Sequence, residues 1–345
     1  MIDYQLLGKT GLRVADICLG TMTFGEEWGW GAAKEEARKI YQAYREQGGN
    51  FIDTANVYTN GTSEGFLGEF MASHRQEMVL ATKYTNAAAG NDANAGGNHR
   101  KNMVQALEAS LRRLKTDYID LYWLHIWDQM TPVEEVMRAF DDVVRAGKVL
   151  YAGVSDAPAW WVAQANTLAE LRGWTRFAGL QIEYSLVERT VERELIPMAK
   201  ALGLGVVAWS PLGGGVLSGK YHSKDGGEGR YSAGPMKQLL RTGAQTDRTV
   251  AALQKVSDET GRSMAQVALA WLRYRETPVI AIVGARRVAQ LQDNLASLTL
   301  ELSDGQVAEL NGASAIELGF PHDFYNIEMV KGMVYGGMRD RILAG

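Results

Sequence analysis

The sequence contains a single cysteine, Cys18, among 345 residues. One cysteine cannot form an internal disulfide or a cysteine-based metal site, so a reducing compartment, the cytoplasm, is expected. The chain also lacks a run of about 18 consecutive apolar residues, which argues against a membrane span. Residues 1–5 (MIDYQ) carry an early acid and begin no apolar h-region, so neither a signal peptide nor a transit peptide is expected.

An excess of positive charge is lacking too. Lys and Arg total 36 against 40 for Asp and Glu, a formal net charge of −4. No stretch concentrates the basic residues, so nucleic acid is not expected as a partner. The hydrophobic share of 46% and the charged share of 22% are ordinary for folded proteins and exclude a globally disordered chain.

Two common phosphate-binding motifs are missing. No G-x-G-x-x-G follows the first predicted strand, which argues against a doubly wound dinucleotide-binding sheet. Gly214, Gly219 and Lys220 have the spacing of a Walker loop, but Tyr221 stands where Ser or Thr is required. The histidines also lack the paired spacing of zinc ligands, which argues against a metal-dependent barrel hydrolase, and no metal is expected. They stand at positions 74, 99, 125, 222 and 322.

Short apolar runs rich in β-branched residues recur along the chain, and nearly every one precedes a segment with helical spacing. Both faces of each run are apolar, which is typical of parallel strands covered by helices on two sides. Eight such units predict an α/β fold, a (β/α)8 TIM barrel, with residues 1–345 as a single domain. The predicted strands are residues 15–20, 49–53, 78–83, 119–125, 149–155, 179–182, 205–210 and 278–284.

Helix boundaries are predicted between these strands. Thr131-Pro132-Val133-Glu134 combines a capping box with Pro at the first helical position, and residues 263–266 (SMAQ) predict a second capping box. Gly48, Gly147 and Gly203 are expected to end three helices in the left-handed conformation.

Several segments depart from this rhythm. Long loops at residues 84–98 and 213–246 follow the third and seventh strands, and loops of this length in compact barrels are usually functional. A tail at residues 312–345 has aromatic residues but weak periodicity. Before the barrel, residues 4–7 and 12–14 flank a Gly-Lys-Thr-Gly turn, which predicts an N-terminal β-hairpin that plugs the barrel bottom.

Catalytic groups of such barrels lie at the C-terminal ends of the strands, so the polar residues that end the eight runs are the first candidates. These are Thr21, Asp53, Lys83, His125, Ser155, Gln181, Ser210 and the Gly284-Ala285-Arg286 turn. A charge that ends an apolar strand needs a counterion, so Asp53 and Lys83 are predicted to face each other. Tyr58, in the loop after Asp53, is close enough to turn back over the barrel mouth.

These residues predict a proton-delivery site. A tyrosine hydroxyl has an ordinary pKa of about 10, and a nearby ammonium, here Lys83, lowers it. Asp53 would keep Lys83 charged, and His125 would donate a hydrogen bond to the same substrate oxygen. Taken singly, each residue also suits an ordinary role as a cap, a surface lysine, a rim aromatic or a structural imidazole. Their joint placement at one barrel mouth favours the catalytic interpretation.

With these residues the chain resembles the aldo-keto reductase superfamily over nearly its whole length. The segments 51–58 (FIDTANVY), 81–83 (ATK) and 117–125 (DYIDLYWLH) match its tyrosine, lysine and histidine motifs in order. The resemblance implies an oxidoreductase that reduces aldehydes or ketones to alcohols. It also implies the catalytic tetrad Asp53, Tyr58, Lys83 and His125, with Tyr58 as the general acid.

The resemblance further implies NADP(H), bound without a Rossmann motif. Residues 209–212 (WSPL) and 219–221 (GKY) are similar to a motif of the branch that includes aryl-alcohol-dehydrogenase-like reductases and potassium-channel β subunits. Trp209 would stack on the nicotinamide, unless it is a core residue, while Ser155 and Gln181 would hold the carboxamide. The implied cofactor-binding residues are Thr21, Met22, Ser155, Gln181, Trp209, Ser210, Pro211, Leu212, Gly214, Lys220, Arg230, Gly284, Arg286, Gln290, Asp293 and Asn294.

Within this set the resemblance suggests a division of roles. Arg286 would pair with the 2′-phosphate through its planar fork, which favours NADP over NAD. Asn294, expected at the start of a helix, would contact adenine or serve an ordinary surface role. Asp293 and Asp156 depart from the residues that relatives often carry at these positions. The residues expected to contact the pyrophosphate are Ser210, Leu212, Gly214, Lys220 and Arg230.

Some questions stay open at this point. Trp28 and Trp30 either wall the substrate pocket, as suits flat or apolar carbonyl compounds, or pack beneath their own loop. The resemblance to channel β subunits leaves an alternative function, a nicotinamide-binding regulatory subunit with slow reductase activity, although the intact tetrad favours the enzyme. The resemblance also allows an oligomer.

Overall fold

The computed structural model describes residues 2–87, 90–220 and 240–342. The strands are β1 (Tyr4–Leu6), β2 (Arg13–Ala15), β3 (Ile17–Gly20), β4 (Phe51–Asp53), β5 (Val79–Tyr84), β6 (Ile119–Leu124), β7 (Val149–Ser155), β8 (Phe177–Glu183), β9 (Gly205–Trp209) and β10 (Val279–Gly284). The α-helices are α1 (Lys34–Glu46), α2 (Thr62–Phe70), α3 (Arg100–Leu114), α4 (Val133–Arg145), α5 (Ala159–Arg172), α6 (Leu195–Leu202), α7 (Ala244–Thr260), α8 (Met264–Leu272), α9 (Val288–Leu295), α10 (Asp304–Ala313), α11 (His322–Tyr325) and α12 (Glu328–Tyr335).

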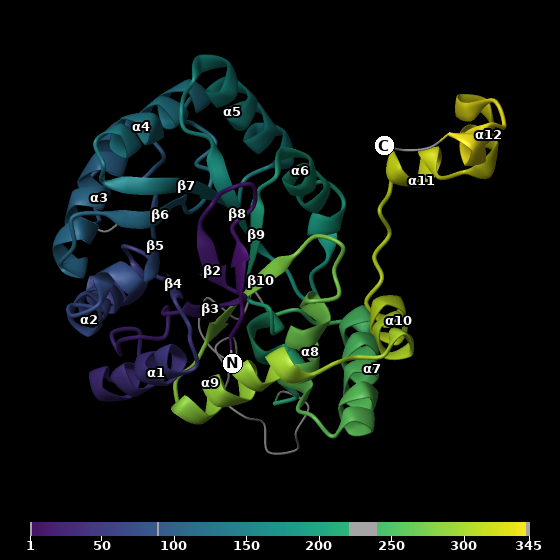
Figure 1. The fold of residues 1–345 in the computed structure, drawn as a ribbon, viewed down its shortest axis with the longest axis horizontal. Helices are drawn as coiled ribbons and strands as arrows, with labels where there is room; N and C mark the ends of the chain where they lie inside the picture. Colours follow the sequence, from purple (N-terminus) through teal and green to yellow (C-terminus); the bar gives the residue numbers. More distant parts are fainter. Residues whose placement is uncertain (1, 88–89, 221–239, 343–345) are drawn as a thin grey trace.

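Strands β3 to β10 form a closed barrel in chain order, and β10 closes it by pairing in parallel with both β3 and β9. Helices surround the strands (Figure 1). Most strand residues are buried because helices cover the outer face and side chains fill the interior. The predicted (β/α)8 barrel is therefore confirmed, and the strand boundaries differ from the prediction by a few residues at most.

The N-terminal hairpin, β1 paired antiparallel with β2, sits at the start of β9. The backbone N–H of Lys9 donates to the carbonyl of Gly203 at 2.8 Å. Gly8 has φ +55°, and a Cβ there would lie 2.4 Å from the oxygen of Gly203, so only glycine fits this approach. The hairpin thus closes the N-terminal end of the barrel, as predicted, and the loops at the opposite rim can form a site.

The predicted capping box at Thr131 is wrong. Helix α4 has Pro132 as its N-cap residue, with no side-chain capping bond. The hydroxyl of Thr131 donates instead to Asp128 Oδ2 at 2.6 Å. A carboxylate is the stronger acceptor, and it comes from the preceding loop rather than from the helix itself.

The second predicted box forms only in part. The Ser263 hydroxyl accepts from the backbone N–H of Gln266, but the Gln266 side chain donates to Asp293 at 2.6 Å instead of returning to the cap. The predicted left-handed ends are confirmed, with φ of 93°, 72° and 69° at Gly48, Gly147 and Gly203.

The loops after β5 and β9 lie at the same rim, as predicted. The first is held by Asn98, whose Nδ2 donates to Thr85 Oγ1 at 2.9 Å and whose backbone N–H donates to Asp128 Oδ2 at 2.7 Å. The second begins with the short helix η4 (Gly213–Ser218) and includes residues outside the described ranges.

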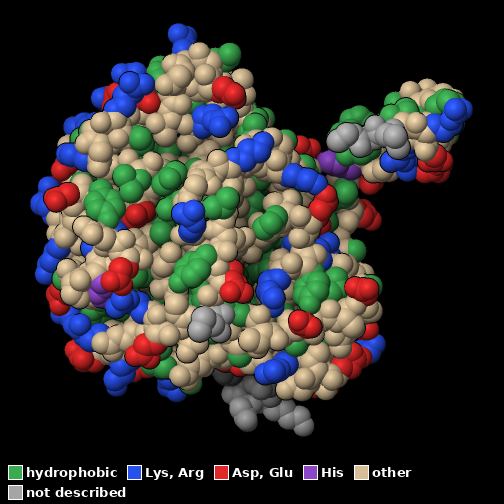
Figure 2. Space-filling model, viewed as in Figure 1, with side chains coloured by type: hydrophobic (Ala, Val, Ile, Leu, Met, Phe, Trp, Pro, Cys, Tyr) green, Lys and Arg blue, Asp and Glu red, His purple; other side chains and the backbone are tan. Residues whose placement is uncertain are grey.

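Beyond α10, the chain leaves the barrel as an arm that carries α11 and α12 (Figure 1). Hydrophobic side chains lie at the surface of this arm, and charges of both signs are interspersed over the barrel face in view (Figure 2). In the described ranges, no helix meets the length and apolarity that a membrane crossing requires. The same residues contain no cluster of three or more His, Cys, Asp or Glu arranged to hold a metal ion.

Candidate active site

Four polar residues meet where β4, β5 and β6 end. Asp53 is the last residue of β4, Lys83 lies near the end of β5, and His125 directly follows β6. Tyr58 opens the short helix η1 (Tyr58–Gly61) in the loop after β4. Because these three strands are parallel neighbours, their C-terminal ends place the four predicted tetrad residues at one rim.

Lys83 is at the centre of this cluster, and its side chain is completely buried. Its Nζ contacts Asp53 Oδ1 and donates to the carbonyl of Thr54 at 2.8 Å and to the hydroxyl of Tyr58 at 3.1 Å. An ammonium has three N–H donors, so these contacts use all of them. The other carboxylate oxygen of Asp53 accepts from Gln181 Nε2 at 2.9 Å. The ammonium is therefore held at a fixed place beside the phenol.

The charges in the cluster follow from burial and pairing. Burial opposes a charge on Lys83, but the negative charge of Asp53 and the bonds to Asp53 and Tyr58 outweigh it and raise the pKa of Lys83. Burial, reinforced by the charge of Lys83, holds the pKa of His125 well below its usual range. At neutral pH the site thus combines a lysine cation with an uncharged imidazole.

Aromatic rings surround the phenol. The rings of Tyr58 and His125 meet edge to face with centroids 6.0 Å apart. The ring of Trp28 also meets Tyr58 edge to face, with centroids 6.4 Å apart, and lies 5.7 Å from the ring of Trp30. Both tryptophans follow β3, so the loop after this strand brings an apolar surface to Tyr58.

The predicted carboxamide site lies across the barrel mouth. Ser155 is 1% exposed, and its hydroxyl makes no hydrogen bond of ordinary geometry with the described part of the chain. Its nearest polar neighbour is the Asp156 carboxyl, which it contacts only loosely, so the hydroxyl keeps bonding capacity for a ligand group. Gln181, predicted to share this role, donates one amide N–H to Asp53, which leaves its second N–H and its Oε1 for a ligand.

Trp209 and Asp156 are joined at this mouth. The indole N–H of Trp209 donates to Asp156 Oδ1 at 3.0 Å. Asp156 directly follows β7 and has a left-handed backbone conformation, with φ 45°. Asp156 is exposed at the rim, yet neighbouring atoms exclude water from its carboxyl. This desolvation raises the pKa of Asp156 to about 6, although the hydrogen bond from Trp209 lowers it. This contact was not predicted, because nothing in the local sequence pairs these two residues.

A groove of about 460 Å³ runs outward from this pair. Trp127, which follows β6, and Arg241 also line it. Arg241 contacts Glu183 and Glu188 at 2.7 and 2.8 Å. Neither Trp127 nor Arg241 was singled out from the sequence, although the position of Trp127 two residues after His125 was an available signal.

The predicted pyrophosphate loop forms a tight turn after β9. The Ser210 carbonyl accepts from Gly213 N at 2.8 Å, and the Ser210 hydroxyl accepts from Gly214 N at 2.9 Å. Pro211 is buried, whereas Leu212 and Lys220 are half-buried. Arg230 lies outside the described residues.

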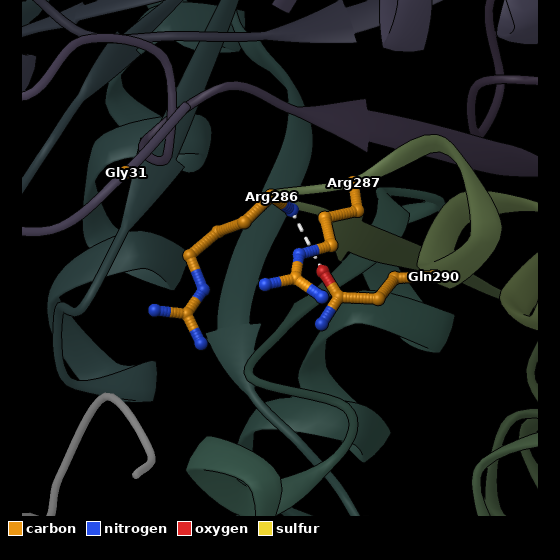
Figure 3. A pocket seen from close by; sticks show the side chains of 4 residues that line it. All are labelled: Gly31, Arg286, Arg287 and Gln290. Carbon is orange, nitrogen blue, oxygen red and sulfur yellow. Dashed lines mark hydrogen bonds between the residues drawn. The ribbon is translucent and has the colours of Figure 1, made fainter. Parts of the chain in front are cut away.

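A cavity of about 420 Å³ lies at the end of β10, where the 2′-phosphate site was predicted. Gly31, Arg286, Arg287 and Gln290 line it, and both guanidinium groups extend toward the same side (Figure 3). The backbone N–H of Arg286 donates to Gln290 Oε1 at 2.9 Å, which fixes the turn that carries the arginines. Two guanidinium groups at one opening suit a phosphate dianion.

The other residues predicted to bind the cofactor lie in several different parts of the fold. Asn294 lies in the last turn of α9, so its predicted position at a helix start is wrong, because the helix already begins at Val288. The carboxylate of Asp293 accepts from Ser263 and Gln266 and so joins α9 to α8. Thr21 is buried and donates to the carbonyl of Asp53 at 3.0 Å. Met22 is half-buried, and Gly284 is exposed at the rim.

Comparison with known proteins agrees with this geometry. The Aldo/keto reductase family model matches residues 16–315. The chain is 41% identical over 325 residues to norsolorinic acid reductase stcV of Emericella nidulans, covering 91% of this chain and 82% of that protein. It is 38% identical over 304 residues to the probable aryl-alcohol dehydrogenase AAD4 of Saccharomyces cerevisiae, covering 84% of this chain and 91% of that protein. The chain therefore belongs to the aldo-keto reductase family.

Proposed function

We propose that the protein is an NADPH-dependent oxidoreductase that reduces aldehydes or ketones to alcohols and catalyses the reverse oxidation. One observation carries this proposal: a buried, charge-balanced ammonium donates to the hydroxyl oxygen of Tyr58 at 3.1 Å. Carbonyl reduction requires a proton at the oxygen while a hydride reaches the carbon. A phenol whose oxygen is already bonded to a cation is suited to provide that proton.

Tyr58 is the general acid in this proposal. When its proton passes to the substrate oxygen, a phenolate remains, and the adjacent Lys83 cation stabilises that negative charge in a site with little water. Asp53 keeps Lys83 charged, and the Thr54 carbonyl fixes the direction of the ammonium. In the reverse reaction the phenolate takes the proton back.

His125 directs the substrate oxygen. As an uncharged imidazole it donates a hydrogen bond without competing with Tyr58 as the acid. Its ring lies edge to face with that of Tyr58, so both polar groups can reach one oxygen. This divides the work between a proton donor and an orienting donor.

The residues present fit NADPH at three places. When bound, NADPH supplies the hydride. The buried hydroxyl of Ser155 would bond the carboxamide, and the Trp209 ring, held by Asp156, would support the nicotinamide. Arg286, with Arg287 beside it, would hold the 2′-phosphate, a group that NADH lacks.

Aromatic carbonyl compounds are the proposed substrate class. Trp28 lies on Tyr58, which offers a flat apolar surface next to the acid. Similar proteins carry names that refer to norsolorinic acid and to aryl alcohols. The assay should therefore compare aromatic aldehydes with short aldehydes and sugar ketones.

The decisive experiment measures initial rates with NADPH and NADH for wild type and Tyr58→Phe. Loss of the proton donor should lower kcat for an aromatic aldehyde by about 1,000-fold, while NADPH binding, followed by fluorescence titration, stays unchanged. Tyr4→Phe is the matched control, because the Tyr4 hydroxyl donates to the Gly48 carbonyl, away from the catalytic rim.

Two outcomes would contradict the proposal. A Tyr58→Phe protein that keeps most of its turnover would show that another group delivers the proton. Wild-type protein that retains NADPH tightly but turns over very slowly with every carbonyl tested would favour the regulatory alternative.

A further inference from the structure

We propose that Asn86 is a positioning residue that determines which nitrogen of His125 carries the proton. The tautomer assignment stands on the geometry of this pair alone. Its catalytic consequence rests on the proposed carbonyl reduction, so the two are tested by separate measurements.

The contact joins the side-chain nitrogen Nδ2 of Asn86 to Nδ1 of His125 at 3.2 Å. An amide nitrogen donates hydrogen bonds and does not accept them. With the Asn86 amide in this orientation, Nδ1 is the acceptor and carries no proton. In a neutral imidazole the proton then resides on Nε2.

The imidazole is kept in the neutral form in which this choice matters. Burial and the charge of Lys83 both disfavour an imidazolium. A neutral ring has one donor and one acceptor nitrogen, and in isolation either arrangement is available. The bond from Asn86 selects one of them.

Asn86 is itself held in place. Its backbone carbonyl accepts from Asn56 Nδ2 at 3.3 Å. The preceding residue, Thr85, has φ 94°, an unusual conformation for a β-branched side chain. A strained backbone persists only where its surroundings hold it, and such positions cluster at functional sites.

At this strained turn, the consecutive side chains of Thr85 and Asn86 both bond to His125. The Thr85 hydroxyl accepts the backbone N–H of His125 at 3.2 Å, while the Asn86 amide reaches the His125 ring. Asn98 Nδ2 donates to the Thr85 hydroxyl at 2.9 Å and holds it in place. The loop after β5 thus fixes both the backbone and the ring of the residue that follows β6.

This arrangement has a direct chemical consequence for His125. With its proton on Nε2, the ring presents an N–H donor from the nitrogen that Asn86 leaves unengaged. In the other tautomer Nε2 would present a lone pair, which repels a carbonyl oxygen. Asn86 thereby makes His125 a hydrogen-bond donor rather than an acceptor toward substrate.

The tautomer can be observed directly by nitrogen-15 NMR of the cofactor-free protein labelled at histidine. A His125→Gln spectrum identifies the His125 signals among those of the five histidines. We expect wild type to show an unprotonated Nδ1 and a protonated Nε2. In Asn86→Asp the carboxylate can only accept, so the proton should move to Nδ1 or both nitrogens should be protonated. Asn94→Asp, an exposed position in the same loop, adds the same charge and should leave the signals unchanged.

Kinetics then test the consequence. Asn86→Asp should lower kcat for an aromatic aldehyde by about 100-fold, the scale of one lost donor to a reacting oxygen, with the KM for NADPH within about 2-fold of wild type. Asn86→Ala should show a smaller loss, because the ring can then sample both tautomers.

A protonated Nδ1 in the wild-type spectrum would overturn the assignment without any variant, since it would mean that the amide faces the ring through its oxygen. Unchanged His125 signals in Asn86→Asp, or an unchanged kcat, would overturn the positioning role. If no carbonyl compound is reduced by wild type, the proposed function fails while the NMR result for Asn86 still stands.

Discussion

The side-chain nitrogen of Lys83 lies 3.1 Å from the hydroxyl oxygen of Tyr58 and also contacts the carboxylate of Asp53. Both charged side chains are almost completely removed from water, with 0% and 3% exposed. Neither charge is therefore stabilised by solvent, and each depends on the other. The acid of the proposed reaction and the stability of the barrel rim rest on the same ion pair.

Breaking this pair should destabilise the fold. Lys83→Met leaves the Asp53 carboxylate buried without a counterion, which should lower the free energy of unfolding by about 3–5 kcal/mol. The double variant Asp53→Asn with Lys83→Met should lose less than the sum of the two single changes. Urea unfolding of the four proteins measures this coupling, and additive losses would show that the pair does not act as a unit.

Removing the Arg286 guanidinium should act on one cofactor only. If it holds the 2′-phosphate, Arg286→Ala should raise the KM for NADPH by about 10- to 100-fold, the effect of a charge-assisted bond of about 1.5–3 kcal/mol. The KM for NADH should change little. Arg172→Ala, an exposed position in α5, serves as the control. An equal rise for both cofactors would remove the 2′-phosphate assignment.

The Asp156 carboxyl should make binding of the oxidised cofactor depend on pH. Because its pKa is raised to about 6, it is largely neutral at pH 5 and charged at pH 7. If Trp209 supports the nicotinamide as proposed, a carboxylate beside it favours the positively charged ring of NADP+, so affinity for NADP+ should rise by about 5-fold from pH 5 to 7. NADPH has an uncharged ring and should lack this increase. Titrations of wild type and Asp156→Asn would show the step in the first protein only.

The half-buried His125 should make the fold less stable in acid. Its pKa is lowered in the folded protein, so below the ordinary value of about 6.5 the unfolded chain binds a proton that the folded chain does not. Stability from this group is therefore fully present above pH 6.5 and decreases by about 1.4 kcal/mol per pH unit below it. The free energy of unfolding, measured at several pH values, should depend less steeply on pH for His125→Gln than for wild type. The same pH dependence in both proteins would contradict the lowered pKa of His125.

Patterns along the chain were sufficient to predict the barrel and the gathering of Asp53, Tyr58, Lys83 and His125 at one rim. The eight apolar runs predict parallel strands, and closure of such strands brings their C-terminal ends to one rim. A polar residue at the C-terminal end of any of these strands therefore lies at that rim. Asp53, Lys83 and His125 were predictable for this reason, although they lie far apart in the sequence.

Hydrogen-bond partners were a different matter. Thr131 was predicted to cap its own helix, but Asp128 accepts its hydroxyl proton, and the Gln266 side chain bonds Asp293 of another helix. The contacts of Asn86 with His125 and of Trp209 with Asp156 likewise join separate strand–loop units. A residue type fixes which of its atoms can donate or accept a hydrogen bond, but it does not fix the partner.

The sequence by itself thus determined the strand order, the open rim and the residue types that gather there, since these depend on local periodicity and on strand ends. Only the folded chain decided which donor meets which acceptor, because that choice depends on distances between loops of different strands. The tautomer of His125 belongs to this second group.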